Sequence, residues 1–320
     1  MRAAIVNSYS EAPRYGAFRD PVATSGDEVV RVRAVALSNL VKAQASGRHY
    51  SSGSELPLVP GNDGVGTLPD GRRVYFFGPR APFGSMAEFS LAATGRIIPL
   101  PDALDDITAA ALGNPGLASW GALLGRAHME AGESVVVNGA TGVAGQQAIQ
   151  VAKYLGASRI VATGRNPEAL EKLRDLGADE TISLEQPDDA LTSALRREFN
   201  EFNLDIVLDY LWGRSAEQIL CAAAGHGSPE GEHRVRFVQI GSISGGLIPL
   251  EAHLLRSSGV ELLGSGLGSL SGKEMVESLG RMFEAAVPFG LRIDTEAVPL
   301  SEVEATWSRT ESGRRVVFTP

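Results

Sequence analysis

Two glycine-rich segments of the chain could hold the phosphates of a nucleotide. The first covers residues 61–66, "GNDGVG", and the second covers residues 139–145, "GATGVAG". A phosphate loop needs glycines that let backbone amides approach the anion, and a helix N-terminus directly after them. The second segment meets both needs, because the apolar run "SVVV" precedes it and "AGQQAIQVAKYLG", with helical spacing, follows. The first does not, because Pro69 and an Asp-Gly turn follow it where a helix would have to run.

We therefore predict that the pyrophosphate of a dinucleotide binds to the second segment. Its residues are Gly139, Ala140, Thr141, Gly142, Val143, Ala144 and Gly145. The alternative is a glycine turn that serves only close packing of a helix on a strand.

The end of the next predicted strand indicates which dinucleotide binds. NAD sites place an acidic residue there, whereas a 2′-phosphate requires a cation. This strand ends in Gly164, Arg165 and Asn166 and has no acid at its tip. We predict NADPH, with these residues at the adenosine ribose and Arg165 on the 2′-phosphate. The alternative for Arg165 is a solvated surface arginine.

Composition favours a protein that acts on small molecules. The 320 residues, 43% of them hydrophobic, suffice for two domains. A net charge of −9 argues against binding to nucleic acid or to anionic membranes. The single cysteine, Cys221, permits neither an intrachain disulfide nor a Cys-rich zinc site, and "ILCAAA" around it predicts a small core residue. No signal peptide or membrane span is evident, so we expect a soluble, cytoplasmic protein.

The pattern of predicted elements changes along the chain. Short strand-like runs broken by Gly and Pro fill the first 115 residues, whereas strands alternate with helices from about residue 134. Six such strands with crossover helices predict a doubly wound Rossmann domain, and thus an α/β fold. We place the β-rich domain at residues 1–115, completed by residues 269–320, and the Rossmann domain at residues 116–268.

This order of parts resembles the medium-chain dehydrogenase/reductase superfamily, and within it the zinc-free quinone oxidoreductase group. The likeness spans essentially the whole chain and rests on "VPGNDGVGTL", "GSMAEF", "GATGVAG", "ATGRN", "LDYLWG" and "LLGSGLGS". It implies a GroES-like catalytic domain and a homodimer joined through the cofactor domains, near "VELLGSG". It also implies that the nicotinamide carboxamide is held by backbone at Ile240, Gly241 and Ser242 and at Gly264, Ser265 and Gly266. Structural glycine bends are the alternative there.

The resemblance also locates three zinc-ligand positions of the related alcohol dehydrogenases. They correspond to Ser38, Asn62 and Asn114, none of which is a plausible zinc ligand. We therefore expect no metal. Without a Lewis acid, hydride transfer remains feasible to electron-poor acceptors, that is, quinones or α,β-unsaturated carbonyls.

Three residues are candidates for a direct role in the reaction: Tyr50, Asn114 and Ser38. Tyr50 could donate a proton or a hydrogen bond to the acceptor, or it could be a partly exposed loop tyrosine. Asn114 could donate its amide to a substrate oxygen, or it could be a turn residue in "GNP". Asp63 could be a polar contact near the substrate or a turn carboxylate. Two other functions stay open: an NADPH-binding sensor or scaffold without turnover, and a reductase dedicated to one biosynthetic enoyl intermediate.

Overall fold

The computed structural model describes residues 1–53, 55–224, 232–309 and 313–320. The chain forms two compact units. One consists of residues 1–114 and 275–320, and the other of residues 115–274. The second boundary thus lies later in the chain than the position 268/269 expected from the sequence. Among the described residues, no helix is both long enough and apolar enough to cross a membrane.

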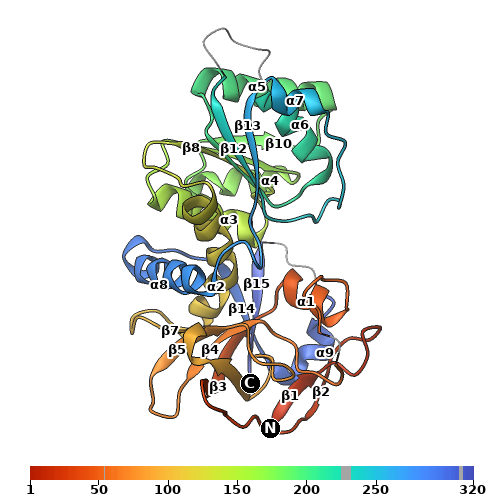
Figure 1. The fold of residues 1–320 in the computed structure, drawn as a ribbon, viewed down its shortest axis with the longest axis vertical. Helices are drawn as coiled ribbons and strands as arrows, with labels where there is room; N and C mark the ends of the chain where they lie inside the picture. Colours follow the sequence, from red (N-terminus) through yellow and green to blue (C-terminus); the bar gives the residue numbers. More distant parts are fainter. Residues whose placement is uncertain (54, 225–231, 310–312) are drawn as a thin grey trace. The chain divides into compact units, whose positions relative to one another are not determined.

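The 115–274 unit is built on a six-stranded parallel sheet (Figure 1). Its strand order is β10-β9-β8-β11-β12-β13, so the direction of winding reverses between β8 and β11. Ligands of such sheets bind at this reversal, outside the carboxyl ends of the strands. The strands are β8 (Ser134–Asn138), β9 (Arg159–Gly164), β10 (Glu180–Ser183), β11 (Ile206–Asp209), β12 (Arg234–Gln239) and β13 (Gly259–Gly264).

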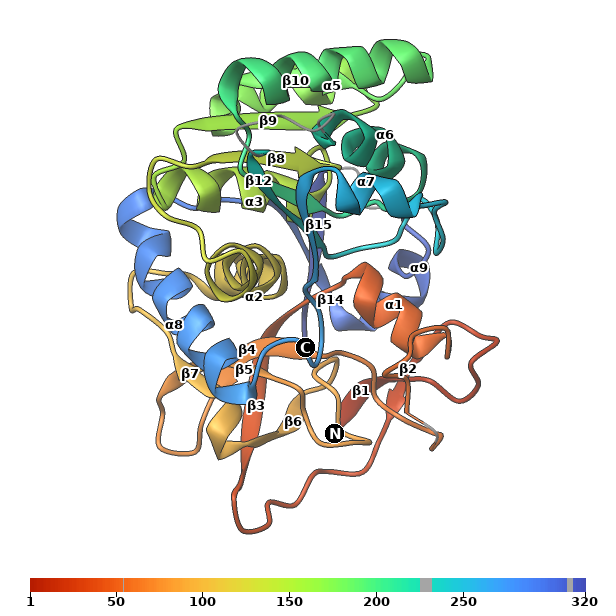
Figure 2. The same ribbon diagram turned by 45° about the horizontal axis from the view of Figure 1, so that its top comes forward.

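Helices cover both faces of this sheet (Figure 2). Helix α3 (Val143–Tyr154) lies on one face, and α5 (Asp188–Phe202) and α6 (Gly213–Ala223) lie on the other. Leu195 of α5 and Ile219 of α6 are buried in one core with the valines of the sheet. The short helices α4 (Pro167–Lys172) and α7 (Ala252–Arg256) complete the unit.

Helix α4 begins where its sequence signals predict, but it ends at Lys172, and a short 3₁₀ helix, Arg174–Leu176, leads from it to Gly177. The Asn166 side chain accepts a hydrogen bond from the Ala169 amide at 3.0 Å, and Pro167 occupies the first turn. Gly177 follows with a left-handed φ of 115°. One expectation for α6 is wrong: Cys221 is exposed rather than a core residue.

The other unit contains a seven-stranded sheet. Its order is β14-β15-β3-β4-β5-β7, and β6 pairs with β3 beside this path. The last strand, β15, pairs antiparallel with β3, so the C-terminal segment rejoins the β-rich unit, as predicted. A separate hairpin joins β1 to β2. The strands are β1 (Arg2–Ile5), β2 (Arg14–Ala17), β3 (Asp27–Ala36), β4 (Asp63–Thr67), β5 (Arg73–Phe77), β6 (Phe89–Ala93), β7 (Ile97–Pro99), β14 (Asp294–Pro299) and β15 (Arg314–Thr319).

Most of the segment "GNDGVG" lies in strand β4. Gly64 and Gly66 lie within β4, opposite β3. A Cβ at Gly66 would lie 2.4 Å from the carbonyl oxygen of Arg31, so glycine is needed here for close approach of two strands. Gly61, with φ of 109°, is the only left-handed residue of the segment.

Helix α2 (Asp106–Trp120) was not expected from the sequence. Pro115 lies inside it, and a π-helical turn, Gly121–Arg126, follows. Its residues from Ala109 to Leu112 are fully buried, so tertiary packing outweighs the turn propensity of "GNP". A Cβ at Gly113 would lie 2.2 Å from the Tyr75 ring, which explains a glycine within the helix. The helices α1 (Asn39–Ala45) and α9 (Val303–Thr306) also belong to this unit, and α8 (Gly272–Phe289) crosses the boundary at 274/275.

Candidate cofactor-binding site

The three glycines of "GATGVAG" have three different roles in the loop between β8 and α3. Gly139 has a left-handed φ of 89°, which makes the turn out of β8. At Gly145 a Cβ would lie 2.5 Å from the carbonyl oxygen of Gly139, so this glycine lets α3 pack against the loop. At Gly142 a Cβ would meet nothing closer than 3.8 Å. The protein itself therefore does not require a glycine at 142, whereas close approach of an anion to the backbone would.

The N-terminus of α3 has backbone amides free to bind an anion. Val143, Ala144 and Gly145 donate no backbone hydrogen bond to the described part of the chain, and the first turn contains no acidic residue. These amides lie at the positive end of the helix dipole. The Gln146 side-chain amide donates to the Thr141 carbonyl at 3.0 Å and holds the loop over this end. The loop can therefore cradle a phosphate.

A buried hydrogen-bond network lies under this loop. The Asn138 side-chain amide donates to Asp209 Oδ1 at 2.8 Å and to Ser215 Oγ at 2.9 Å. Thr163 Oγ1 donates to Asn138 Oδ1 at 2.7 Å and accepts from the Gly139 amide at 3.2 Å. Asn138, Thr163 and Asp209 are fully buried and come from the carboxyl ends of three adjacent strands.

The sequence reasoning did not single out Asp209. Burial raises the pKa of this carboxyl, while hydrogen bonds from Trp212, Asn138 and Leu211 lower it. The available signal was Asp209 itself, a carboxylate that ends the apolar strand "IVLD" at the edge of the sheet where the cofactor is expected.

The end of β9 lies against the loop. A Cβ at Gly164 would lie 2.5 Å from the Thr141 side chain, so Gly164 allows the two segments to touch. Arg165 is exposed, and no described residue forms a hydrogen bond or ion pair with its side chain. The Oδ1 of Asn166 is engaged as the cap of α4, so its side-chain nitrogen and its backbone stay available to a cofactor.

The residues predicted near the nicotinamide follow β12 and β13, at the same edge of the sheet. The amides of Ile240 and Gly241 both donate to the Asp209 carbonyl, at 2.8 and 3.1 Å. The Ser265 amide donates to the Gln239 carbonyl at 2.8 Å, and the Gly264 carbonyl accepts from Arg126. Ser242 and Gly266 continue these two loops. The structure thus places both loops at the same edge of the sheet as the glycine loop, with β11 between β8 and β12 and with β13 next to β12.

The three catalytic candidates all belong to the other unit. Ser38 is buried and caps α1, its Oγ accepting from the Val41 amide at 3.2 Å. Asn114 lies within α2 and is half-buried, so its interpretation as a turn residue is wrong. The Tyr50 side chain is 76% exposed, and its ring lies 4.1 Å from that of His49.

Asp63 is the first residue of β4 and is buried, so it is not a turn carboxylate. The Tyr75 hydroxyl donates to Asp63 Oδ2 at 2.7 Å. Burial raises the pKa of Asp63, while the Tyr75 hydrogen bond and the charge of Arg315 lower it. The Nε and one terminal nitrogen of Arg315 are buried and have no hydrogen-bond partner among the described residues.

The positions that hold zinc in the related alcohol dehydrogenases do not fit a zinc ion here. Ser38, Asn62 and Asn114 offer a hydroxyl and two amides in place of thiolate and imidazole. Among the described residues, no group of three His, Cys, Asp or Glu side chains could hold a metal.

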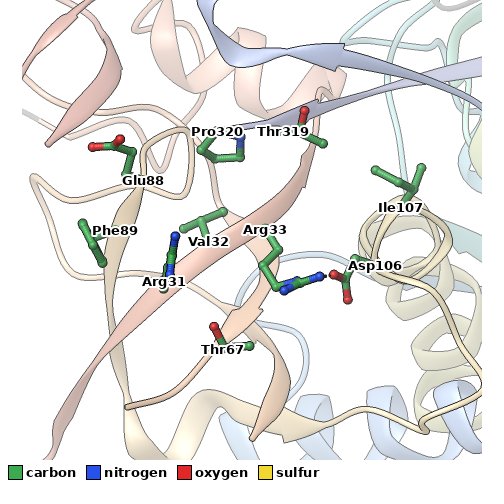
Figure 3. Close-up of a pocket in the computed structure, with 10 residues that line it drawn as sticks. All are labelled: Arg31, Val32, Arg33, Thr67, Glu88, Phe89, Asp106, Ile107, Thr319 and Pro320. Carbon is green, nitrogen blue, oxygen red and sulfur yellow. Dashed lines mark hydrogen bonds and ion pairs between the residues drawn. The ribbon is translucent and has the colours of Figure 1, made fainter. Parts of the chain in front are cut away.

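A hollow of about 510 Å³ on the 1–114 and 275–320 unit contains none of the predicted site residues. Figure 3 shows that its Arg33 and Asp106 side chains point toward each other, and they form an ion pair. Arg73 also pairs with Asp106, at 2.9 Å. Because these charges satisfy one another, the hollow contributes nothing to the candidate site.

Comparison with known proteins agrees with this architecture. The zinc-binding dehydrogenase family model matches residues 144–284. A probable NADPH-dependent quinone reductase of Emericella nidulans is 27% identical over an alignment that covers all of both chains. The quinone oxidoreductase of Thermus thermophilus, solved also in complex with NADPH, has a TM-score of 0.81 at 26% identity, again over both full chains. A mycobacterial quinone oxidoreductase, 21% identical over both full chains, has the same fold with a TM-score of 0.85. Together with the glycine loop and the reversal of the parallel sheet, these matches support a likeness of the chain to the medium-chain dehydrogenase/reductase superfamily, and within it to the quinone oxidoreductase group.

Proposed function

We propose that the protein is an oxidoreductase that uses NADPH to reduce a quinone or an α,β-unsaturated carbonyl compound, without zinc. The observation that carries this proposal is the glycine loop, whose free amides face the reversal point of the parallel sheet. The relatives named as NADPH-dependent quinone reductases support both the oxidoreductase activity and the cofactor.

Preference for the phosphorylated cofactor is assigned to Arg165. Its exposed guanidinium has no partner among the described residues and follows directly on Gly164, which touches the phosphate loop. A guanidinium can bind a phosphate through two parallel hydrogen bonds, so a free arginine at this place favours the 2′-phosphate.

Reduction without zinc is proposed because Ser38, Asn62 and Asn114 offer a hydroxyl and two amides where related enzymes hold zinc. When bound, NADPH supplies a hydride, which an electron-poor acceptor takes up together with one proton, so that a quinone becomes a hydroquinone. The amide of Asn114 is the proposed hydrogen-bond donor to the acceptor oxygen, because its side-chain nitrogen can donate to an oxygen on which negative charge develops. Tyr50 is the proposed proton donor, and its exposure leaves proton exchange with solvent open.

The carboxamide of the cofactor is assigned to backbone groups at 240–242 and 264–266. Both segments follow the carboxyl ends of their strands, at the same edge of the sheet as the glycine loop. The backbone bonds that hold them leave little freedom, so these groups can orient a ring without rearrangement.

A homodimer is proposed through β13. This strand is at the edge of its sheet and pairs only with β12 among the described strands. Leu262, at 37% exposure, lies on it. Pairing with the same strand of a second copy would cover both the open edge and this leucine. The cytoplasmic location stays a prediction from the sequence.

The function is tested by following NADPH oxidation with a panel of quinones, enones and enoyl thioesters. We expect turnover with several quinones or enones. No oxidation with any acceptor, despite saturable NADPH binding, would contradict enzymatic reduction and favour a sensor or scaffold. Turnover with a single enoyl thioester alone would identify a dedicated biosynthetic reductase.

A further inference from the structure

The Asp209 carboxylate is linked by hydrogen bonds to both ends of the cofactor site. The first path leads to the glycine loop: Asp209 Oδ1 accepts from the Asn138 side-chain amide at 2.8 Å, and Asn138 Oδ1 accepts from Thr163 Oγ1 at 2.7 Å. Thr163 Oγ1 in turn accepts from the Gly139 amide at 3.2 Å. Gly139 is the residue that turns the loop through its left-handed conformation, so the path ends where the loop backbone is shaped.

The second path leads to the loop after β12. Asp209 Oδ1 accepts from the amides of Leu211 and Trp212, each at 3.1 Å. Trp212 has a φ of 57° and a ψ of −161°, a backbone conformation that costs a non-glycine residue free energy and that these bonds hold in place. The Leu211 carbonyl then accepts from the Ser244 amide at 2.9 Å.

The two paths also meet by direct packing. A Cβ at Gly139 would lie 2.8 Å from the Leu211 side chain, so the phosphate loop rests on this residue. A Cβ at Gly213 would lie 2.9 Å from the Ser244 carbonyl oxygen, and one at Gly241 would lie 2.5 Å from the Tyr210 carbonyl oxygen. The turn after β11 is therefore in close contact with the phosphate loop on one side and with residues 240–245 on the other.

We propose that Asp209 is a positioning residue that couples the phosphate loop, residues 139–145, to the loop at residues 240–245, so that filling one orders the other. The proposal rests on the proposed cofactor site, because both loops are assigned to NADPH there. Asp209 itself touches no cofactor atom in this account, since it is fully buried below the loops.

Burial makes the coupling strong. A buried donor that loses its acceptor is left unsatisfied, and hydrogen bonds to a carboxylate are stronger than neutral ones. Movement of the Gly139 amide therefore cannot be absorbed locally by water and passes through Thr163 and Asn138 to Asp209.

The test measures amide hydrogen exchange with and without 2′-phospho-ADP, a probe that carries adenosine, the 2′-phosphate and the two phosphates of the 5′-diphosphate but lacks the nicotinamide. In the wild-type protein we expect slower exchange in residues 139–146 and also in residues 240–245, which the probe does not reach. Thr163→Val keeps the shape of the side chain but removes the hydroxyl. We expect this variant to keep the slower exchange in residues 139–146, to lose it in residues 240–245, and to have a Kd for NADPH about tenfold higher.

Three variants separate coupling from folding. Thr163→Ser retains the hydroxyl and should restore the protection of residues 240–245. Asp209→Ala should abolish it. Asp205→Asn is the matched control, because Asp205 accepts from the Ser134 amide and hydroxyl just before the amino end of the same strand. In Asp205→Asn the probe should protect residues 240–245 as much as it does in the wild type.

Each contrary result has a distinct meaning. Protection of residues 139–146 alone in the wild-type protein, or unchanged protection of 240–245 in Thr163→Val, would overturn the coupling and leave the cofactor site standing. Equal loss in Asp205→Asn would show a general structural effect and overturn it as well. Absence of any protection at residues 139–146 would overturn the proposed cofactor site itself.

Discussion

Substitution of alanine for Gly142 and for Gly145 should separate cofactor binding from folding. At Gly145 the new Cβ would lie 2.5 Å from both the Gly139 carbonyl oxygen and the Ala140 Cα, which are backbone atoms that cannot turn aside. Overpacking of this kind destabilises a protein by about 1–3 kcal/mol. At Gly142 the nearest atom would be 3.8 Å away and φ is −78°, so alanine fits the folded protein without strain.

At Gly142 the alanine substitution should weaken cofactor binding although it leaves the folded protein unstrained. A Cβ there would project from the helix N-terminus and displace a phosphate from one amide. Hydrogen bonds to charged groups are worth about 1.5–3 kcal/mol each, so the Kd for NADPH should rise about 10- to 150-fold. The free energy of unfolding should stay within about 0.5 kcal/mol of the wild type.

The two variants are compared by urea unfolding and by titration with NADPH. We expect Gly142→Ala to be stable and to bind weakly, and Gly145→Ala to be destabilised. The reasoning is refuted if Gly142→Ala binds NADPH as tightly as the wild type, or if it unfolds as readily as Gly145→Ala.

Three further perturbations test other parts of the account. Arg165→Glu should raise the KM for NADPH about 10- to 150-fold and leave the KM for NADH nearly unchanged. The exposed control Arg197→Glu should alter neither KM. Equal effects of Arg165→Glu on both cofactors would contradict the assignment of Arg165 to the 2′-phosphate. Burial raises the pKa of Asp63 in the folded protein. Its contribution to stability is therefore complete below the pKa of the unfolded chain, near pH 4, and is lost as the pH rises through the pKa of the folded protein. In urea titrations the free energy of unfolding of the wild type relative to Asp63→Asn should fall from about pH 4 upward, and a difference that does not depend on pH would oppose this. Leu262→Arg should convert the proposed dimer to a monomer by light scattering, whereas Val287→Arg, at 42% exposure on α8, should not; a wild-type monomer would refute the dimer.

Much of the cofactor unit could be predicted because its local signals agree with its tertiary structure. The strand, the glycine loop and the helical spacing after it all point to one βαβ unit. Asn166 and Pro167 mark the start of the next helix, and Gly177 ends the 3₁₀ turn that follows it. Return of the C-terminal segment to the β-rich unit was also predictable, because a strand-like end needs a sheet to join, but its pairing with β3 was not.

The errors arise where long-range packing decides the structure. Turn propensity at "GNP" is outweighed in α2 by burial of the helix against Tyr75 and its neighbours. The glycines of β4 are explained only by the carbonyl oxygens of β3, which lie far away in the sequence. Asp209 went unnoticed because its partners, Asn138 and Thr163, come from two other strands and meet it only in the folded sheet.

The central claim is that the protein transfers hydride from NADPH to a quinone without a metal. It is tested most directly by measuring NADPH oxidation with a quinone before and after exhaustive chelation, with the metal content determined on the same samples. The account predicts an unchanged kcat in protein that holds no stoichiometric zinc. A kcat that falls on chelation and returns with added Zn²⁺ would contradict it, because Ser38, Asn62 and Asn114 would then have to support a metal that their donor atoms do not suit.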